Sequence, residues 1–313
     1  MTSTRKVLNW IGMGLFVLLG VAATIPLFLI IIDIYSKGID AINRLGGLWH
    51  FLTSEPPSPL SKSGGVGPPL IGTLYMTALG AIGGFALGFP LGVYIGEMRR
   101  EKLANAARVG VNVLVEFPTI TIGLFVYAVM GLVQDDLNRY ILGPVSATLK
   151  AALGNSVFYN YVSWFVGPLD SFNAYAGAAA LALVMIPYVA LITASAYASV
   201  AQPLREAAYG IGGREFNALF IVMRKVVSRA VLTAALIGTA KIAGETAPLL
   251  FTAFGNNYYA PFTGSTGAVS LWIYAASETP YNVQIMSAYG AAAVLLTIIL
   301  ILFISARIKA IHD

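Results

Sequence analysis

Cysteine is absent from this chain of 313 residues, and histidine nearly so. Without cysteine there is no disulfide framework, thiolate metal site or thiol nucleophile. His50 and His312 lie near opposite ends of the chain, so we expect neither a histidine metal centre nor a catalytic triad. The sequence G-x-x-x-x-G-K followed by Ser or Thr, which would cradle the phosphates of a nucleotide, is missing too. These absences predict a protein that is not an enzyme and holds no metal or cofactor.

Charged residues are scarce as well. Asp, Glu, Lys and Arg make up 11% of the chain, hydrophobic residues make up 58%, and the mean hydropathy is +0.77, whereas about 25% of a soluble domain is charged. Apolar runs of roughly 20 residues, the length that crosses a bilayer, recur along the sequence. A net charge of +5 would fit nucleic acid or anionic lipid, but its distribution matters more than its sum. We therefore predict an all-α, polytopic membrane protein that contacts lipid and no nucleic acid.

Six runs are long and apolar enough to span the membrane. The first follows Arg5 and Lys6, as in a signal peptide, but its apolar core is longer than a signal's and no small-residue cleavage pattern ends it. We expect it to be a retained anchor. The predicted spans are Leu8–Asp33, Leu70–Glu97, Ala104–Val133, Ala174–Val200, Ala230–Phe254 and Gln284–Ile308.

The distribution of Lys and Arg predicts how these spans are oriented. One set of ends and loops carries thirteen of these residues and the other set carries five. Positive charge is retained on the cytoplasmic side of a membrane. Both termini of a six-span chain are therefore predicted to lie in the cytoplasm, with the protein in the cell membrane.

The segments predicted to face outward differ in character. Tyr35–Pro69 is rich in Gly, Pro and Ser and is expected to form a surface loop. Segments 134–173 and 255–283 carry many aromatic residues, including Trp164 and Trp272. Aromatic residues gather at membrane interfaces, which favours an interfacial belt over a docking surface.

One predicted cytoplasmic loop, residues 201–229, has the sequence AQPLREAAYGIGGREFNALFIVMRKVVSR. Pro203 suits the first turn of a helix, and good helix formers continue to Tyr209. Gly210, followed by two more glycines, is predicted to end that helix, and a second amphipathic helix to begin at Arg214. Periodicity alone is equally compatible with an interfacial helix that lies on the inner leaflet.

The same loop resembles a known pattern. Glu206, Ala207, Ala208 and Gly212 match the E-A-A-x-x-x-G loop of importer permeases in the ATP-binding cassette (ABC) superfamily. The resemblance implies a coupling helix that sits in a cleft of a cytoplasmic ATPase. A Glu in the first turn and small Ala side chains that permit close approach suit a helix that transmits a rigid-body push. This chain has Arg229 where the family usually has a proline, so its hinge departs from the pattern.

Three further stretches resemble phosphate-specific permeases of the PstA kind: GGVGPPLIGTLY at 64–75, FPTITIGLF at 117–125 and AGETAPLLFTA at 243–253. The resemblance covers nearly everything from residue 64 onward. It implies an ABC importer type I permease fold, a bundle of six transmembrane helices, with the permease domain over residues 64–313 and the coupling loop at 201–229. Residues 1–63 then add an N-terminal anchor and an external loop.

Two ionisable residues, Lys241 and Glu245, lie within the predicted fifth span. Charges inside a span are costly and normally face a protein interior or a watery path. One turn apart on a helix, they can pair, either as a purely structural ion pair or as part of a path in which Lys241 attracts phosphate and Glu245 tempers its affinity. We include the adjacent Thr246 in that path. The family usually has arginine at position 241, and lysine lacks the bidentate fork that matches phosphate oxygens, which favours weak, passing contact. Glu116 is a further anomaly, to which we assign no function.

Together these features predict one membrane subunit of an ATP-driven phosphate importer, forming half of the translocation path. The resemblance implies a second, PstC-like permease subunit, a dimer of PstB-like cytoplasmic ATP-binding subunits and an external PstS-like phosphate-binding protein. Two alternatives stay open: a permease for another oxyanion, such as sulfate, molybdate or phosphonate, and a membrane scaffold in phosphate-dependent signalling. A secondary transporter is disfavoured because the chain has no inverted repeat.

Overall fold

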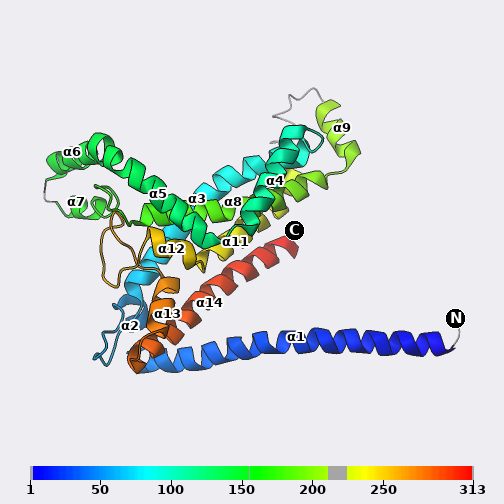
Figure 1. Cartoon of the computed structure of the whole chain (residues 1–313), viewed down its shortest axis with the longest axis horizontal. Coiled ribbons are helices and arrows are strands. Elements are labelled where there is room, and N and C mark those ends of the chain that lie inside the picture. Colours follow the sequence, from blue (N-terminus) through cyan, green and yellow to red (C-terminus); the bar gives the residue numbers. More distant parts are fainter. Residues whose placement is uncertain (1–2, 155, 211–223, 312–313) are drawn as a thin grey trace.

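The computed structural model describes residues 3–154, 156–210 and 224–311. Six helical stretches of these residues are long and apolar enough to cross a membrane, which confirms the predicted all-α, six-span architecture. Figure 1 shows the resulting bundle, with α1 extending away from it along one side. The helices are α1 (Ser3–Arg44), α2 (Leu48–Thr53), α3 (Gly67–Glu97), α4 (Lys102–Glu116), α5 (Thr119–Leu137), the π-helix η1 (Asn138–Leu142), α6 (Gly143–Leu153), α7 (Val157–Val162), α8 (Ala174–Ala198), α9 (Gln202–Gly210), α11 (Arg224–Ala243), α12 (Ala247–Thr252), α13 (Val269–Ser277) and α14 (Asn282–Ile311).

Helices α3 and α8 form the centre of the bundle and pack along each other's length (Figure 1). A glycine recurs at every fourth position of α3 on the face toward α8, from Gly80 to Gly96. A Cβ atom at Gly92 would lie 2.6 Å from the carbonyl oxygen of Ala190, so the two backbones are in direct contact. Small residues permit this close approach in membrane helices. Met76, Leu181, Met185, Ile242 and Leu249 belong to the main buried cluster beside this contact.

The first helix is longer than predicted. It continues past Asp33 to Arg44, and residues expected in an external loop instead pack on α14 and α13. Leu45 and Phe51 are fully buried there. Charged residues of this stretch lie on the exposed face of α1, where Lys37 pairs with Asp33 and Arg44 with Asp40, each at 2.9 Å. Such i, i+4 pairs support a helix rather than ending it.

The predicted third and fifth spans are not continuous helices. The third is divided into α4 and α5 at Phe117, whose φ of −70° and ψ of 130° are extended. A residue that precedes proline, here Pro118, is disfavoured in the helical conformation. The long apolar helical stretch in this region is Thr119–Leu153, displaced from the predicted Ala104–Val133. The fifth is divided into α11 and α12 by the link Gly244–Thr246.

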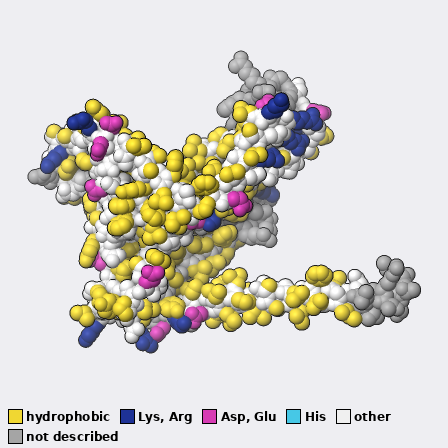
Figure 2. All heavy atoms as spheres, viewed as in Figure 1, with side chains coloured by type: hydrophobic (Ala, Val, Ile, Leu, Met, Phe, Trp, Pro, Cys, Tyr) yellow, Lys and Arg dark blue, Asp and Glu magenta, His cyan; other side chains and the backbone are white. Residues whose placement is uncertain are grey.

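The distribution of side chains on the surface agrees with a membrane protein. Figure 2 shows hydrophobic side chains along α1 and over the flank of the bundle, with Lys and Arg side chains gathered near α4 and α9. Arg99, Arg100 and Lys102 are exposed in that basic region. Nearly all described side chains between Trp10 and Ile32 of α1 are exposed and apolar, as expected for a helix in lipid.

Candidate functional site: a cavity at the α11–α12 break and the exposed helix α9

Lys241 and Glu245 form an ion pair between the Nζ and Oε1 atoms. Lys241 lies in the last turn of α11, whereas Glu245 lies beyond the end of that helix, in the link that precedes α12. The predicted pairing is therefore present, but the prediction that both residues share one continuous helix is wrong. Gly244 and the approach to Pro248 in the first turn of α12 account for the break, since neither favours a helix interior.

The two charges differ in exposure. The Lys241 side chain is 43% exposed and the Glu245 side chain 9%. A buried carboxylate is costly unless it is paired, so Lys241 stabilises Glu245 where it lies. The backbone is held too, because Ser270 Oγ in α13 donates a hydrogen bond of 2.8 Å to the carbonyl oxygen of Glu245. The Glu245 carboxylate in the link between α11 and α12 is thus held in position, and the more exposed Lys241 ammonium group pairs with it.

The ion pair lines an open cavity of about 600 Å³. Lys241, Glu245 and Thr246, all predicted from the sequence, lie on this one cavity. Tyr188 of α8 also lines it and was not identified from the sequence. The sequence offers little indication of its position, because a tyrosine after Pro187 in an apolar helix is as typical of a buried packing residue as of one that lines a cavity. The remaining lining residues are Ile237, Ala240, Gly244, Ala247, Ile299 and Phe303.

The chemistry of this cavity suits brief contact with an anion. An ammonium group attracts an anion, here from a partly exposed position beside its carboxylate partner, and the hydroxyls of Thr246 and Tyr188 are able to donate hydrogen bonds. The Glu245 carboxylate opposes tight binding of the same anion. A cation paired with a carboxylate thus offers an anion both attraction and repulsion at this cavity.

Helix α9 begins at Gln202 and places Pro203 in its first turn, as predicted. The helix extends through Gly210, its last described residue, and the two further glycines predicted to help end it lie outside the described residues. Glu206 is exposed, and its Oε1 accepts a hydrogen bond of 3.1 Å from Gln202 Nε2. Ala207 is exposed beside it, and Ala208 lies in the next position of the helix. Gly212 and the predicted second helix lie outside the described residues.

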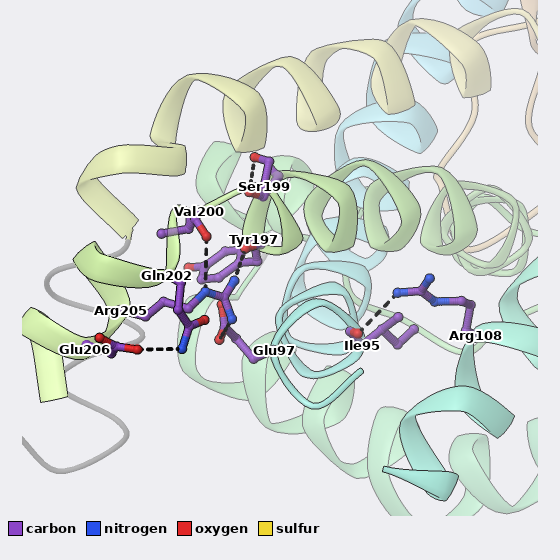
Figure 3. Close-up of polar contacts among 10 residues, drawn as sticks. Ile95, Glu97, Arg108, Tyr197, Ser199, Val200, Gln202, Arg205 and Glu206 are labelled. Atoms are coloured by element: carbon purple, nitrogen blue, oxygen red, sulfur yellow. Dashed lines mark hydrogen bonds and ion pairs between the residues drawn. The ribbon is translucent and has the colours of Figure 1, made fainter. Parts of the chain in front are cut away.

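Arg205 is the residue of α9 that sequence reasoning missed. Its Nη1 atom lies 2.8 Å from Oε2 of Glu97, the last residue of α3 (Figure 3). Its Nη2 donates to the carbonyl oxygen of Tyr197, and its Nε donates to that of Val200 at 3.3 Å. In the sequence Arg205 stands out only as one of the positive charges of a cytoplasmic loop. The signal that could have identified it is Glu97, a carboxylate at the end of an apolar span that needs a cationic partner.

Glu116 is the last residue of α4 and is exposed. It lies at the break before Phe117 rather than within a continuous span, which accounts for a charge at this position without assigning it a function. Nearby, Arg108 Nη2 donates to the carbonyl oxygen of Ile95 at 3.5 Å and joins α4 to the end of α3 (Figure 3).

Known proteins resemble this chain in sequence and in fold. A family model described as a binding-protein-dependent transport system inner membrane component matches residues 88–313. The probable phosphate transport system permease protein PstA of Methanocaldococcus jannaschii is 36% identical over 287 residues, which cover 91% of this chain and 87% of that protein. The phosphate transport system permease protein PstA of Haemophilus influenzae is 28% identical over 306 residues, covering 97% and 94%. A solved chain of the MetNI methionine ABC transporter in an inward-facing conformation is 18% identical, with a TM-score of 0.54 over 77% of this chain and 93% of that chain. This last likeness concerns the fold alone.

Proposed function

Because this chain belongs to the family of binding-protein-dependent transport system inner membrane components, we propose that it is a permease subunit of an ATP-driven importer of inorganic phosphate. The observation that carries the proposal is the cavity at the end of α11, where Lys241, Glu245 and Thr246 meet. The 36% identity to a relative named as a phosphate permease supports phosphate as the substrate.

The chain works as one half of a translocation path, beside a second, PstC-like permease subunit. Two PstB-like ATP-binding subunits bind on the cytoplasmic side, and a PstS-like protein delivers phosphate from outside. ATP is hydrolysed in the partner subunits, because this sequence contains no P-loop. The membrane subunit itself is non-catalytic.

Transport proceeds by alternating access. Closure of the ATPase dimer pushes α9 through its exposed Glu206 and Ala207, and the bundle then opens the cavity beside Lys241 to the cytoplasm. Both chain termini lie on the same side as α9. Figure 1 supports this arrangement, because the early part of α1 and the end of α14 point toward the side of the view on which α9 lies.

The test is reconstitution of the complete complex in vesicles, with the external binding protein and radiolabelled phosphate. We expect uptake that requires ATP, that excess unlabelled phosphate suppresses and that sulfate or molybdate at equal concentration does not. Lys241→Gln should abolish uptake, whereas Lys150→Gln, which removes an exposed lysine of α6, should not. Suppression by sulfate or molybdate would overturn the assignment of phosphate, and uptake without ATP would overturn the importer itself.

A further inference from the structure

One arginine side chain connects three helices at the base of α9. The guanidinium group of Arg205 contacts the Glu97 carboxylate at the end of α3, the carbonyl oxygen of Tyr197 in the last turn of α8 and that of Val200 in the link after α8 (Figure 3). We propose that Glu97 and Arg205 anchor α9 to the α3–α8 pair, so that a push on α9 moves both helices together. This inference rests on the proposed function, in which α9 receives the push.

Arg205 is the inward contact of α9. Its residue exposure is 8%, whereas the other residues of α9 whose exposure the structure describes lie at the surface. Those exposed residues are Gln202, Pro203, Leu204, Glu206, Ala207 and Gly210. Besides the contacts of Arg205, a short backbone link of residues 199–201 joins α9 to α8. A link of that length limits how far α9 can lie from α8 but does not fix the direction of its axis. The contacts of the Arg205 guanidinium group fix that direction.

The geometry requires arginine rather than any cation. A guanidinium group offers five donors in a planar fork, and Arg205 uses different nitrogen atoms for the carboxylate and for each carbonyl oxygen. An ammonium group is a compact point charge on a flexible stem and lacks this fixed fork. Replacement by lysine would keep the charge and lose the triple connection.

The pair is buried, with side chains 10% exposed for Arg205 and 5% exposed for Glu97. The other carboxylate oxygen of Glu97, Oε1, is buried without a hydrogen-bond partner among the described residues. A buried ion pair often contributes no more stability than apolar side chains of similar volume. We therefore assign the Glu97–Arg205 pair a positioning role: it holds α9 in place, although one carboxylate oxygen of Glu97 has no described hydrogen-bond partner.

The two helices that receive the push are able to move as a unit. Near the anchor, Cβ atoms at Gly88 and Gly96 would lie 2.8 Å from the carbonyl oxygen of Ile186 and 2.7 Å from that of Ala194. Backbones in such direct contact cannot slide past each other without displacing packed atoms. A displacement delivered at Glu97 and Tyr197 is therefore carried along α3 and α8 into the core beside Ile242, one residue from Lys241.

The experiment measures phosphate transported per ATP hydrolysed by the reconstituted complete complex. Glu97→Gln removes the charge at constant volume, and Arg205→Lys keeps the charge but removes the fork. Both should retain ATP hydrolysis while transport per ATP falls about fivefold or more, the scale of a typical coupling between sites. A purely structural role would lower thermal stability and leave this ratio unchanged. Asp40→Asn, which breaks the exposed pair with Arg44 on α1, is the matched control and should keep the wild-type ratio.

A second measurement keeps Glu97 and Arg205 intact, so it tests the proposal even if the Glu97→Gln and Arg205→Lys complexes fail to assemble. The chain contains no cysteine, so in a complex whose partner subunits have had their cysteines replaced, Arg100→Cys and Gln202→Cys, both at exposed positions, allow specific spin labelling beside α3 and on α9. The distance between the labels should be the same with and without ATP. A change of about 5 Å, one helical turn, would overturn the anchor, as would an unchanged transport ratio in assembled Glu97→Gln and Arg205→Lys complexes. Absence of ATP-dependent transport by the wild-type complex would instead overturn the proposed function, and the anchor with it.

Discussion

Lys241 and Glu245 form an ion pair across the end of α11, with the ammonium on the helix and the carboxylate on the link that follows it. The carboxylate is the more buried partner. The pair therefore lets a buried negative charge exist at the point where the helix stops. Whether it also serves an anion is decided by removing one charge and then both.

Lys241→Gln leaves Glu245 buried without its cation, and the loss of a charge-assisted hydrogen bond of this kind costs about 1–3 kcal/mol. If Lys241 serves phosphate, uptake is abolished while the complex still assembles. The measurement combines phosphate uptake with the yield of intact complex. Failure of assembly would indicate a structural ion pair.

The double variant Lys241→Gln with Glu245→Gln removes both charges and leaves neither unpaired. We expect assembly equal to wild type and no phosphate uptake, because the neutral cavity no longer attracts the anion. Uptake close to wild type in this variant would contradict the assignment of Lys241 to the path.

Exposed Glu206 is predicted to contact the ATPase. Glu206→Ala should reduce the amount of ATPase that co-purifies or uncouple hydrolysis from transport, since a carboxylate on the docking face is lost. Gln202→Ala is the matched control because it removes the hydrogen-bond donor to Glu206 and keeps the carboxylate. Equal co-purification and equal coupling in the two variants would argue that α9 is an interfacial helix.

The contact between α3 and α8 should tolerate no added side chain. In Gly92→Ala the new Cβ would lie 2.6 Å from both the Ala190 carbonyl oxygen and Thr193 Cβ, and overpacking of this kind costs about 1–3 kcal/mol. Thermal unfolding of the detergent-solubilised complex should show a lower midpoint. Gly110→Ala in α4 has open space around the new atom, so its midpoint should not fall. An unchanged midpoint in Gly92→Ala would mean that the two helices separate more easily than their packing indicates.

The packing of α13 on α14 depends on a buried hydrogen bond, in which Trp272 Nε1 donates to Ser287 Oγ at 3.0 Å. Ser287→Ala leaves the indole N–H buried and unpaired, at a cost of about 1–3 kcal/mol. Adding Trp272→Phe removes the orphaned donor and should recover part of that loss. Thermal midpoints of the two variants test this, and a double variant less stable than Ser287→Ala would show that the indole contributes chiefly through its volume.

Several predicted residues were located correctly because their signal is local. The pairing of Lys241 with Glu245 was predicted from a spacing of four residues and is present although α11 ends between them, and the start of α9 follows from Pro203 and the helix formers after it. The predicted ends of helices were wrong where the local sequence favours both a helix and a loop. The Gly, Pro and Ser content of Tyr35–Pro69 indicates a loop as a whole, but its first residues belong to α1, where the charges form i, i+4 pairs.

The sequence by itself determined the class of protein, because apolar runs of membrane-spanning length leave a chain with few charges no soluble alternative. It also determined which ionisable residues lie within apolar runs, and these residues are the candidates for function. Only the tertiary structure decided which distant groups meet: Glu97 with Arg205, Tyr188 with Lys241, and Phe51 with the first half of α14 at Gly290. Those contacts join residues far apart in the chain, and their geometry depends on how closely glycine-lined helices approach, which is a property of packing rather than of any local pattern.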